Sequence, residues 1–190
     1  MEENVGSTPR SLWLIPDPAA SRVLAEIIQR ASHRLATPRF RPHLTLLGNV
    51  PGDVEDSIAK SARLAARITP FAIDLVGVAH EPGYFRCVSF EARLSPALRR
   101  ARRAARRFFR VTGQDLFRPH VSVVYGKVGA AERDRRARGL LDYVPMRFRA
   151  AALELVFTGG PPRAWRPIAR FSLSGRGAGP AAGGARSRRS

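Results

Sequence analysis

One stretch of the sequence occurs twice. Residues 40–48 read FRPHLTLLG and residues 117–126 read FRPHVSVVYG, so Phe, Arg, Pro and His match in both copies. The residues that follow repeat the order apolar, hydroxyl, apolar, apolar, which is typical of a short strand, and each copy ends at a glycine. A chain that carries such a repeat is expected to fold into two similar halves, each supplying one edge of a shared cleft.

The spacing within each copy places chemistry on one face of a strand. Residues i and i+2 of a strand point to the same side, so His43 shares a face with Thr45, and His120 with Ser122. Imidazole titrates near pH ~6.5, so one histidine can be neutral while the other is protonated. The pair would then supply a general base and a general acid, while the hydroxyls donate hydrogen bonds to phosphate oxygens. This set suits cleavage of a phosphodiester without a metal.

Two simpler interpretations compete with this one. The histidines and hydroxyls are polar residues that begin two strands, and a single His-x-Thr would be explained in that way. The duplication together with the flanking Phe-Arg-Pro favours a site instead. A metal centre is the other alternative, but two histidines with no acidic residue in either copy make a poor ligand set. We therefore predict neither a metal nor another cofactor.

The composition limits the class of protein and its partners. The chain has 190 residues, 44% of them hydrophobic, which is enough for a sizeable core and excludes a wholly disordered chain. One cysteine, Cys87, excludes an intramolecular disulfide framework and a zinc site built from several cysteines. The net charge of +18 favours anionic partners such as RNA or phosphorylated small molecules. No apolar run predicts a membrane span, and the polar N-terminus predicts a cytoplasmic protein.

Strand and helix patterns alternate along the chain, which predicts an α+β domain over residues 10–174. Residues 1–9 are expected to be flexible, and the basic tail 175–190 to be disordered. The expected strands lie near 11–15, 44–47, 71–78, 85–94, 121–125, 146–149, 152–158 and 168–173. Helices are expected to begin at Asp17, Asp53 and Ser95, with an arginine-rich one near 130–140. Hairpin-like connections predict antiparallel or mixed sheets with helices on one face.

The paired His-x-Thr and His-x-Ser resemble the motifs of the 2H phosphoesterase superfamily, which includes 2′-5′ RNA ligases and cyclic phosphodiesterases. Within it, the chain is most similar to the plant and fungal cyclic phosphodiesterase branch. The matching stretches run in order from residue 11 to residue 173: 11–16, 40–45, 84–88, 118–125 and 165–173. The chain departs from that branch in its single cysteine, its many arginines and its basic tail.

The resemblance implies a bilobal fold in which two pseudo-twofold-related sheets flank a central cleft and helices cover the outer faces. It implies hydrolysis of nucleoside 2′,3′-cyclic phosphates or of ADP-ribose 1″,2″-cyclic phosphate. By analogy His120 is the base that activates water, His43 is the acid that protonates the leaving oxygen, and Thr45 and Ser122 hold the phosphate.

Three aromatic residues match positions that line the family's cleft: Trp13, Phe85 and Tyr125. Core packing is the alternative for each of them. Simple alternation from His120 would place Tyr125 on the opposite face, unless the end of the strand twists it back.

Two further functions remain open. The first is an RNA end-processing enzyme of the same superfamily, a 2′-5′ RNA ligase or phosphodiesterase. It is favoured by the charge and by the seven arginines between Arg99 and Arg110, which mostly occupy one helix face. The second is a non-catalytic module that binds RNA or a nucleotide. The expected partner is thus a cyclic phosphate nucleotide or an RNA end, bound by a monomer.

Overall fold

The computed structural model describes residues 9–175 and shows an α+β fold of seven strands and four helices. The predicted flexible N-terminus and basic tail lie, apart from residues 9 and 175, outside the described residues. The strands are β1 (Arg10–Pro16), β2 (Leu44–Leu47), β3 (Phe71–His80), β4 (Val88–Ala92), β5 (His120–Val124), β6 (Met146–Phe157) and β7 (Arg166–Ser172). The helices are α1 (Pro18–Leu35), α2 (Val54–Arg67), α3 (Pro96–Phe108) and α4 (Ala130–Arg138).

All strand pairs are antiparallel, and the strands follow the order β1-β2-β5-β4-β3-β6-β7. The α+β class and the antiparallel pairing are therefore confirmed. The strands form one hydrogen-bonded sheet where two were expected. The reason is that β1 pairs with both β2 and β6, so every strand except β7 belongs to a closed ring of neighbours.

Two segments differ from the sequence-based prediction. The strands expected near 146–149 and 152–158 are one strand, β6, because its first part pairs with β3 while its second part pairs with β1 and β7. The strand expected over 85–94 is shorter. It begins at Val88, and a single 3₁₀ turn, Tyr84–Arg86, precedes it.

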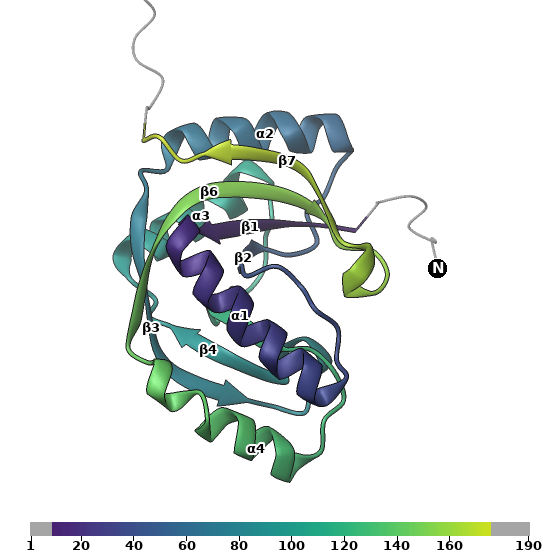
Figure 1. Cartoon of the computed structure of the whole chain (residues 1–190). Coiled ribbons are helices and arrows are strands. Elements are labelled where there is room, and N and C mark those ends of the chain that lie inside the picture. Colours follow the sequence, from purple (N-terminus) through teal and green to yellow (C-terminus); the bar gives the residue numbers. More distant parts are fainter. Residues whose placement is uncertain (1–8, 176–190) are drawn as a thin grey trace, which may run out of the picture.

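The predicted caps begin three of the helices. The carboxylate of Asp17 accepts hydrogen bonds from the amides of Ala19 and Ala20, and Asp53 and Ser95 each accept one from the residue three positions later. Such side chains satisfy amides that have no partner within the helix. Helix α1 packs on β1 and β5, α2 on β6 and β7, α3 on β2 and β3, and α4 on β3 and β4 (Figure 1).

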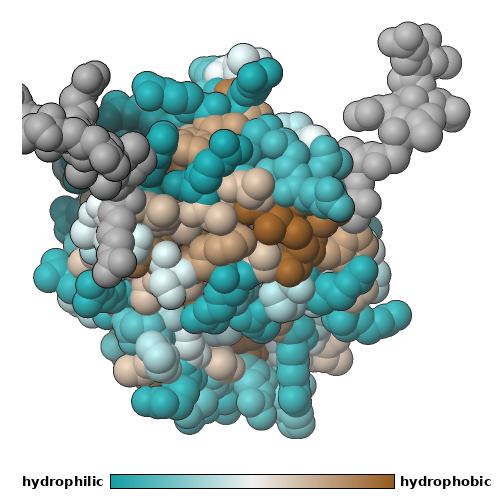
Figure 2. All heavy atoms as spheres, turned by 90° about the horizontal axis from the view of Figure 1, so that it is seen from above, coloured by the Kyte–Doolittle hydropathy of each residue, from teal (hydrophilic) through white to brown (hydrophobic). Residues whose placement is uncertain are grey.

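The main core lies between the helices and one face of the sheet. It includes Leu44, Leu46, Val121 and Val123, all 0% exposed. A second, small cluster around Trp13 and Ile15 lies apart from it. Seen from above, the surface is largely hydrophilic, with a band of apolar residues across its middle (Figure 2). Among residues 9–175, no helix combines the length and apolar character that crossing a membrane requires.

Candidate active site

Strands β2 and β5 bring the two copies of the repeat side by side. The strands are antiparallel, and Leu44 pairs with Val121, which is the equivalent residue of the other copy. Equivalent residues face each other in this way when a local twofold axis relates the two strands. The register places His43 opposite Ser122 and Thr45 opposite His120. All four side chains therefore share one face, since leucine and valine at the alternate positions enter the main core.

Both histidines are oriented by the same local bond. The Nδ1 atom of His43 lies 2.6 Å from the carbonyl oxygen of Arg41, and that of His120 lies 2.9 Å from the carbonyl oxygen of Arg118. A carbonyl only accepts, so Nδ1 carries the hydrogen and donates it. In the neutral ring, Nε2 is then the atom left to take up a proton. The repeat thus positions two imidazoles for acid and base chemistry in the same way.

Two carboxylates from outside the repeat hold the motif arginines, and no pattern in the sequence predicts either of them. The guanidinium of Arg41 lies 2.8 Å from the carboxylate of Glu154, which also binds Arg170 at 3.0 Å. Arg118 lies 3.4 Å from the carboxylate of Glu81. The backbone carbonyl of each arginine therefore orients a histidine. The side chain of the same arginine binds a carboxylate from a segment distant in sequence. The only signal for this role in the sequence is that both copies contain the arginine.

Burial controls the protonation of the two histidines. His43 is only 5% exposed, and this loss of hydration lowers its pKa from 6.5 to about 4, although the bond to Arg41 opposes the shift. A charge on His120 lowers it further. Burial also lowers the pKa of His120, and the bond to Arg118 again acts in the opposite direction. Both imidazoles are therefore neutral near pH 7 when no substrate is bound.

The burial of His43 predicts a loss of stability in acid. Folding lowers the pKa of His43. The stability that this pKa difference provides is therefore complete above the pKa of the unfolded chain, 6.5, and is lost as the pH falls towards 4. Between pH 7 and pH 4, the free energy of unfolding should fall by about 3 kcal/mol through His43 alone. Urea unfolding at pH 7 and at pH 4 measures this fall. In His43→Phe the fall between the two pH values should be smaller by that amount than in the unmodified protein. The exposed control His33→Gln should lose as much stability as the unmodified protein, and equal losses in all three would contradict the account.

Trp13 lies against the first histidine. Its ring stacks on that of His43 with 3.5 Å between centroids and 9° between planes. Trp13 is 3% exposed and pairs with Thr45 through the β1–β2 ladder. The structure therefore places Trp13 in the site as support for His43 rather than as an open face for a base.

Tyr125 also reaches the site, from just beyond the end of β5. Its hydroxyl lies 3.5 Å from Nε2 of His43, and its ring stacks on Phe40 at 3.8 Å. Burial raises the pKa of the phenol, which keeps it a neutral hydrogen-bonding group. Simple alternation along β5 does not predict this position of Tyr125. The chain changes direction at the next residue, Gly126, which has a φ of 145°.

Phe85 offers the most accessible aromatic ring near the histidines, because 53% of the residue is exposed. Its ring lies 5.4 Å from that of Tyr125 and 5.8 Å from that of Trp165. The carbonyl of Phe85 accepts a 3.0 Å hydrogen bond from the hydroxyl of Ser122. The turn that carries Phe85 is thus bound directly to the second motif. Phe40 and Trp165 complete the aromatic cluster, although neither is among the residues that the sequence predicts for the site.

The fold and the site together define a class. An antiparallel sheet that sets paired His-x-Thr and His-x-Ser motifs about a local twofold axis is the arrangement of two-histidine phosphoesterases. The profile of the 2′-5′ RNA ligase superfamily matches residues 15–161. The chain belongs to this superfamily.

Solved structures show the same fold. The protein TT0787 of Thermus thermophilus has a TM-score of 0.60 and 20% identity, and the match covers 90% of this chain and 100% of that one. Escherichia coli LigT complexed with 3′-AMP has a TM-score of 0.56 and 16% identity, with 88% and 99% covered. LigT complexed with NADP+ has the same TM-score, 21% identity and the same coverage. Among curated proteins, no sequence matches the chain. The closer likeness to the plant and fungal branch stays a prediction.

Proposed function

We propose that the protein is a metal-independent phosphodiesterase that hydrolyses cyclic phosphates of nucleosides, with the 2′,3′-cyclic phosphate or ADP-ribose 1″,2″-cyclic phosphate as substrate. The observation that carries the proposal is the register of β2 and β5, which sets each motif histidine opposite the hydroxyl of the other motif. Two proton-transfer groups and two hydroxyl groups then lie on the same face of two neighbouring strands. The superfamily match supports the same chemistry.

The proposed reaction is a single displacement at phosphorus. His120 takes a proton from water, whose oxygen bonds to phosphorus as the bond from phosphorus to one ribose oxygen breaks. His43 gives its proton to that ribose oxygen, and the product is a phosphomonoester beside a free hydroxyl. Thr45 donates to a non-bridging oxygen, on which negative charge increases in the transition state, and Ser122 does so when its hydroxyl turns from the carbonyl of Phe85 to the phosphate. The roles of the two histidines follow the family resemblance, and the twofold arrangement supplies both groups from equivalent positions.

The lowered pKa values predict an acidic optimum. The pH dependence of kcat/KM reports the free enzyme, in which one imidazole must be charged and the other neutral. The pKa of His43 is about 4, and that of His120 lies below its ordinary value. The profile should therefore be bell-shaped with its maximum below pH 6.5 and a steady decline towards pH 8. A maximum at pH 7.5 or above would show that the free histidines are not desolvated as the structure indicates.

The exposed ring of Phe85 is the proposed stacking surface for the base. Stacking on an aromatic side chain contributes about 1–3 kcal/mol per base, so Phe85→Ala should lower kcat/KM for a cyclic nucleotide by about fivefold to 150-fold. Phe85→Trp should retain activity because it keeps the aromatic face. The equally apolar Phe85→Leu should behave like alanine, and full activity in the leucine variant would assign Phe85 to packing instead.

A second function, processing of RNA ends, is favoured by the charge of +18. The experiment that separates the two compares kcat/KM for a 2′,3′-cyclic mononucleotide and for an oligonucleotide with the same end, at several salt concentrations. Comparable turnover of both supports the small cyclic nucleotide. Much faster turnover of the oligonucleotide, with a steep decline as salt increases, supports the RNA end. Turnover of neither would contradict both forms of the proposal.

A further inference from the structure

A basic groove lies between α1 and α4, and its volume is about 250 Å³. Its floor is formed by buried apolar side chains: Ile27, Ala31, Val123, Val124 and Leu140. Four arginines border it, two from α1 and two from α4: Arg30, Arg34, Arg135 and Arg136. Neither the motif histidines nor the motif hydroxyls line this groove, so it is separate from the candidate active site.

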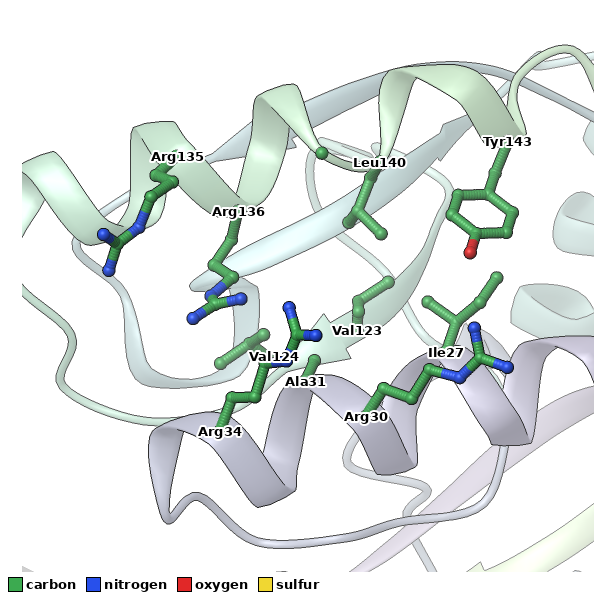
Figure 3. Close-up of a pocket in the computed structure, with 11 residues that line it drawn as sticks. Ile27, Arg30, Ala31, Arg34, Val123, Val124, Arg135, Arg136, Leu140 and Tyr143 are labelled. Carbon is green, nitrogen blue, oxygen red and sulfur yellow. The ribbon is translucent and has the colours of Figure 1, made fainter.

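The arginines of the two helices point into the same space. Figure 3 shows Arg34 of α1 and Arg136 of α4 extending from opposite sides into the groove, with Tyr143 at its far end. Arg30 lies one helical turn before Arg34, so both side chains leave the same face of α1. The groove therefore combines a converging set of positive charges with an apolar floor and an aromatic ring.

The arrangement of charge in the groove differs from that elsewhere in the chain. Among residues 9–175, five carboxylates each pair with two arginines: Asp74, Glu81, Asp115, Glu132 and Glu154. Glu132 pairs with Arg135 and Arg136 of its own helix. In the same part of the chain, no ion pair involves Arg34, and no acidic residue lines the groove.

The convergence of Arg34 and Arg136 points to an anion from outside the chain. Guanidinium groups that extend into one space repel each other unless an anion lies between them. The pair between Glu26 and Arg30, at 3.7 Å, offsets little of this charge because both side chains are largely exposed. Arginine binds phosphate through two parallel hydrogen bonds, so a phosphate group is the anion that suits the groove best.

The remaining lining favours an organic phosphate over a free inorganic ion. Ligand pockets usually combine an apolar lining with a few polar groups that fix the orientation of the ligand. Here the apolar floor continues to the half-buried ring of Tyr143, which an aromatic group of a ligand can contact. The volume lies near the lower end of the range for ligand pockets, about 300 Å³, so the groove suits a small molecule.

We propose that the groove binds an aromatic phosphate of the size of a mononucleotide. Its phosphate lies between Arg34 and Arg136, and its ring lies on the apolar floor beside Tyr143. No group of the proposed reaction takes part, so this second site does not depend on the proposed function.

Methyl NMR of the isoleucines tests the proposal, with adenosine 5′-monophosphate as the probe. Ile27 lines the groove, whereas Ile15 packs with Trp13, which stacks on His43, so the two methyl groups report on different sites. The probe should shift the Ile27 resonance until it saturates. Inorganic phosphate should need about tenfold higher concentrations, because it lacks the aromatic part. Adenosine at the concentrations used for the probe should give no saturating shift, because it lacks the charge.

Two double variants that remove the same charge locate the binding. Arg30→Gln with Arg34→Gln should weaken binding of the probe, measured at Ile27, by about tenfold or more, because charged hydrogen bonds to phosphate are lost. The control is Arg22→Gln with Arg63→Gln, since Arg22 and Arg63 are exposed and lie outside the groove. The control should keep its affinity within twofold, and the methyl spectra without the probe show whether each variant is folded.

Three results would overturn the proposal. Equal weakening in both double variants would show general attraction to a basic protein. A shift of Ile15 without one of Ile27 would place the probe in the active site alone. Equal affinities for inorganic phosphate and for the probe would show that the floor and Tyr143 contribute nothing. Because the methyl shifts need no turnover, failure of the proposed function leaves this test intact.

Discussion

Alanine at either His43 or His120 is expected to lower the turnover of a 2′,3′-cyclic nucleotide by about 10²- to 10⁴-fold, the usual contribution of a positioned acid or base. Each imidazole has Nδ1 bound to a carbonyl, which leaves Nε2 for proton transfer, so neither can replace the other. The loss should appear in kcat, because proton transfer is required in the transition state more than in binding. Steady-state kinetics with a cyclic mononucleotide measures it.

A third histidine provides the control for this experiment. His80 lies 3.2 Å from Asp134 of α4, and its replacement by alanine removes an imidazole without reaching the motifs. His80→Ala should keep kcat within about twofold. The double variant of His43 and His120 should be little worse than either single variant, because groups that act as a unit are not additive. Retained turnover in either single variant, with the fold confirmed by circular dichroism, would contradict the two-histidine mechanism.

The second large effect concerns Thr45. The β2–β5 register sets Thr45 opposite His120, and its hydroxyl is the group proposed to donate to a non-bridging phosphate oxygen. Removal of one such donor costs about 10²- to 10³-fold in kcat, so Thr45→Val should show a loss of that size with KM little changed. Valine has nearly the same shape as threonine, which separates the hydroxyl from packing.

The conservative variant completes this test. Thr45→Ser keeps the hydroxyl and should retain most of the activity of the unmodified protein. Retained activity in Thr45→Val would remove Thr45 from the proposed mechanism. Activity that is retained in Thr45→Val and lost in Thr45→Ser would show that the methyl group, and hence packing beside Trp13, is what matters.

Much of the fold could be predicted from local signals. The caps Asp17, Asp53 and Ser95 begin helices as expected, because capping depends on residues close in sequence. The strand of the first motif, β2, has the predicted ends for the same reason. The prediction of two strands, 146–149 and 152–158, was wrong. They form one strand because β6 pairs with β1, β3 and β7, which are distant in sequence.

The candidate site shows the same division between local and distant information. Alternation within each strand predicts which side chain faces which way, and the duplication predicts that the motifs meet. The carboxylates of Glu154 and Glu81 were missed because they come from β6 and from the segment before β4, and only the folded chain brings them to Arg41 and Arg118. The stack of Trp13 on His43 likewise depends on the pairing of β1 with β2.

The reaction proposed for the two histidines needs no metal ion. The most direct test is turnover of a nucleoside 2′,3′-cyclic phosphate in the presence of EDTA, with the product identified by phosphorus NMR. We expect undiminished conversion to the 2′-phosphate, and no conversion with the double variant of His43 and His120. Turnover that EDTA abolishes and an added divalent metal restores would contradict it.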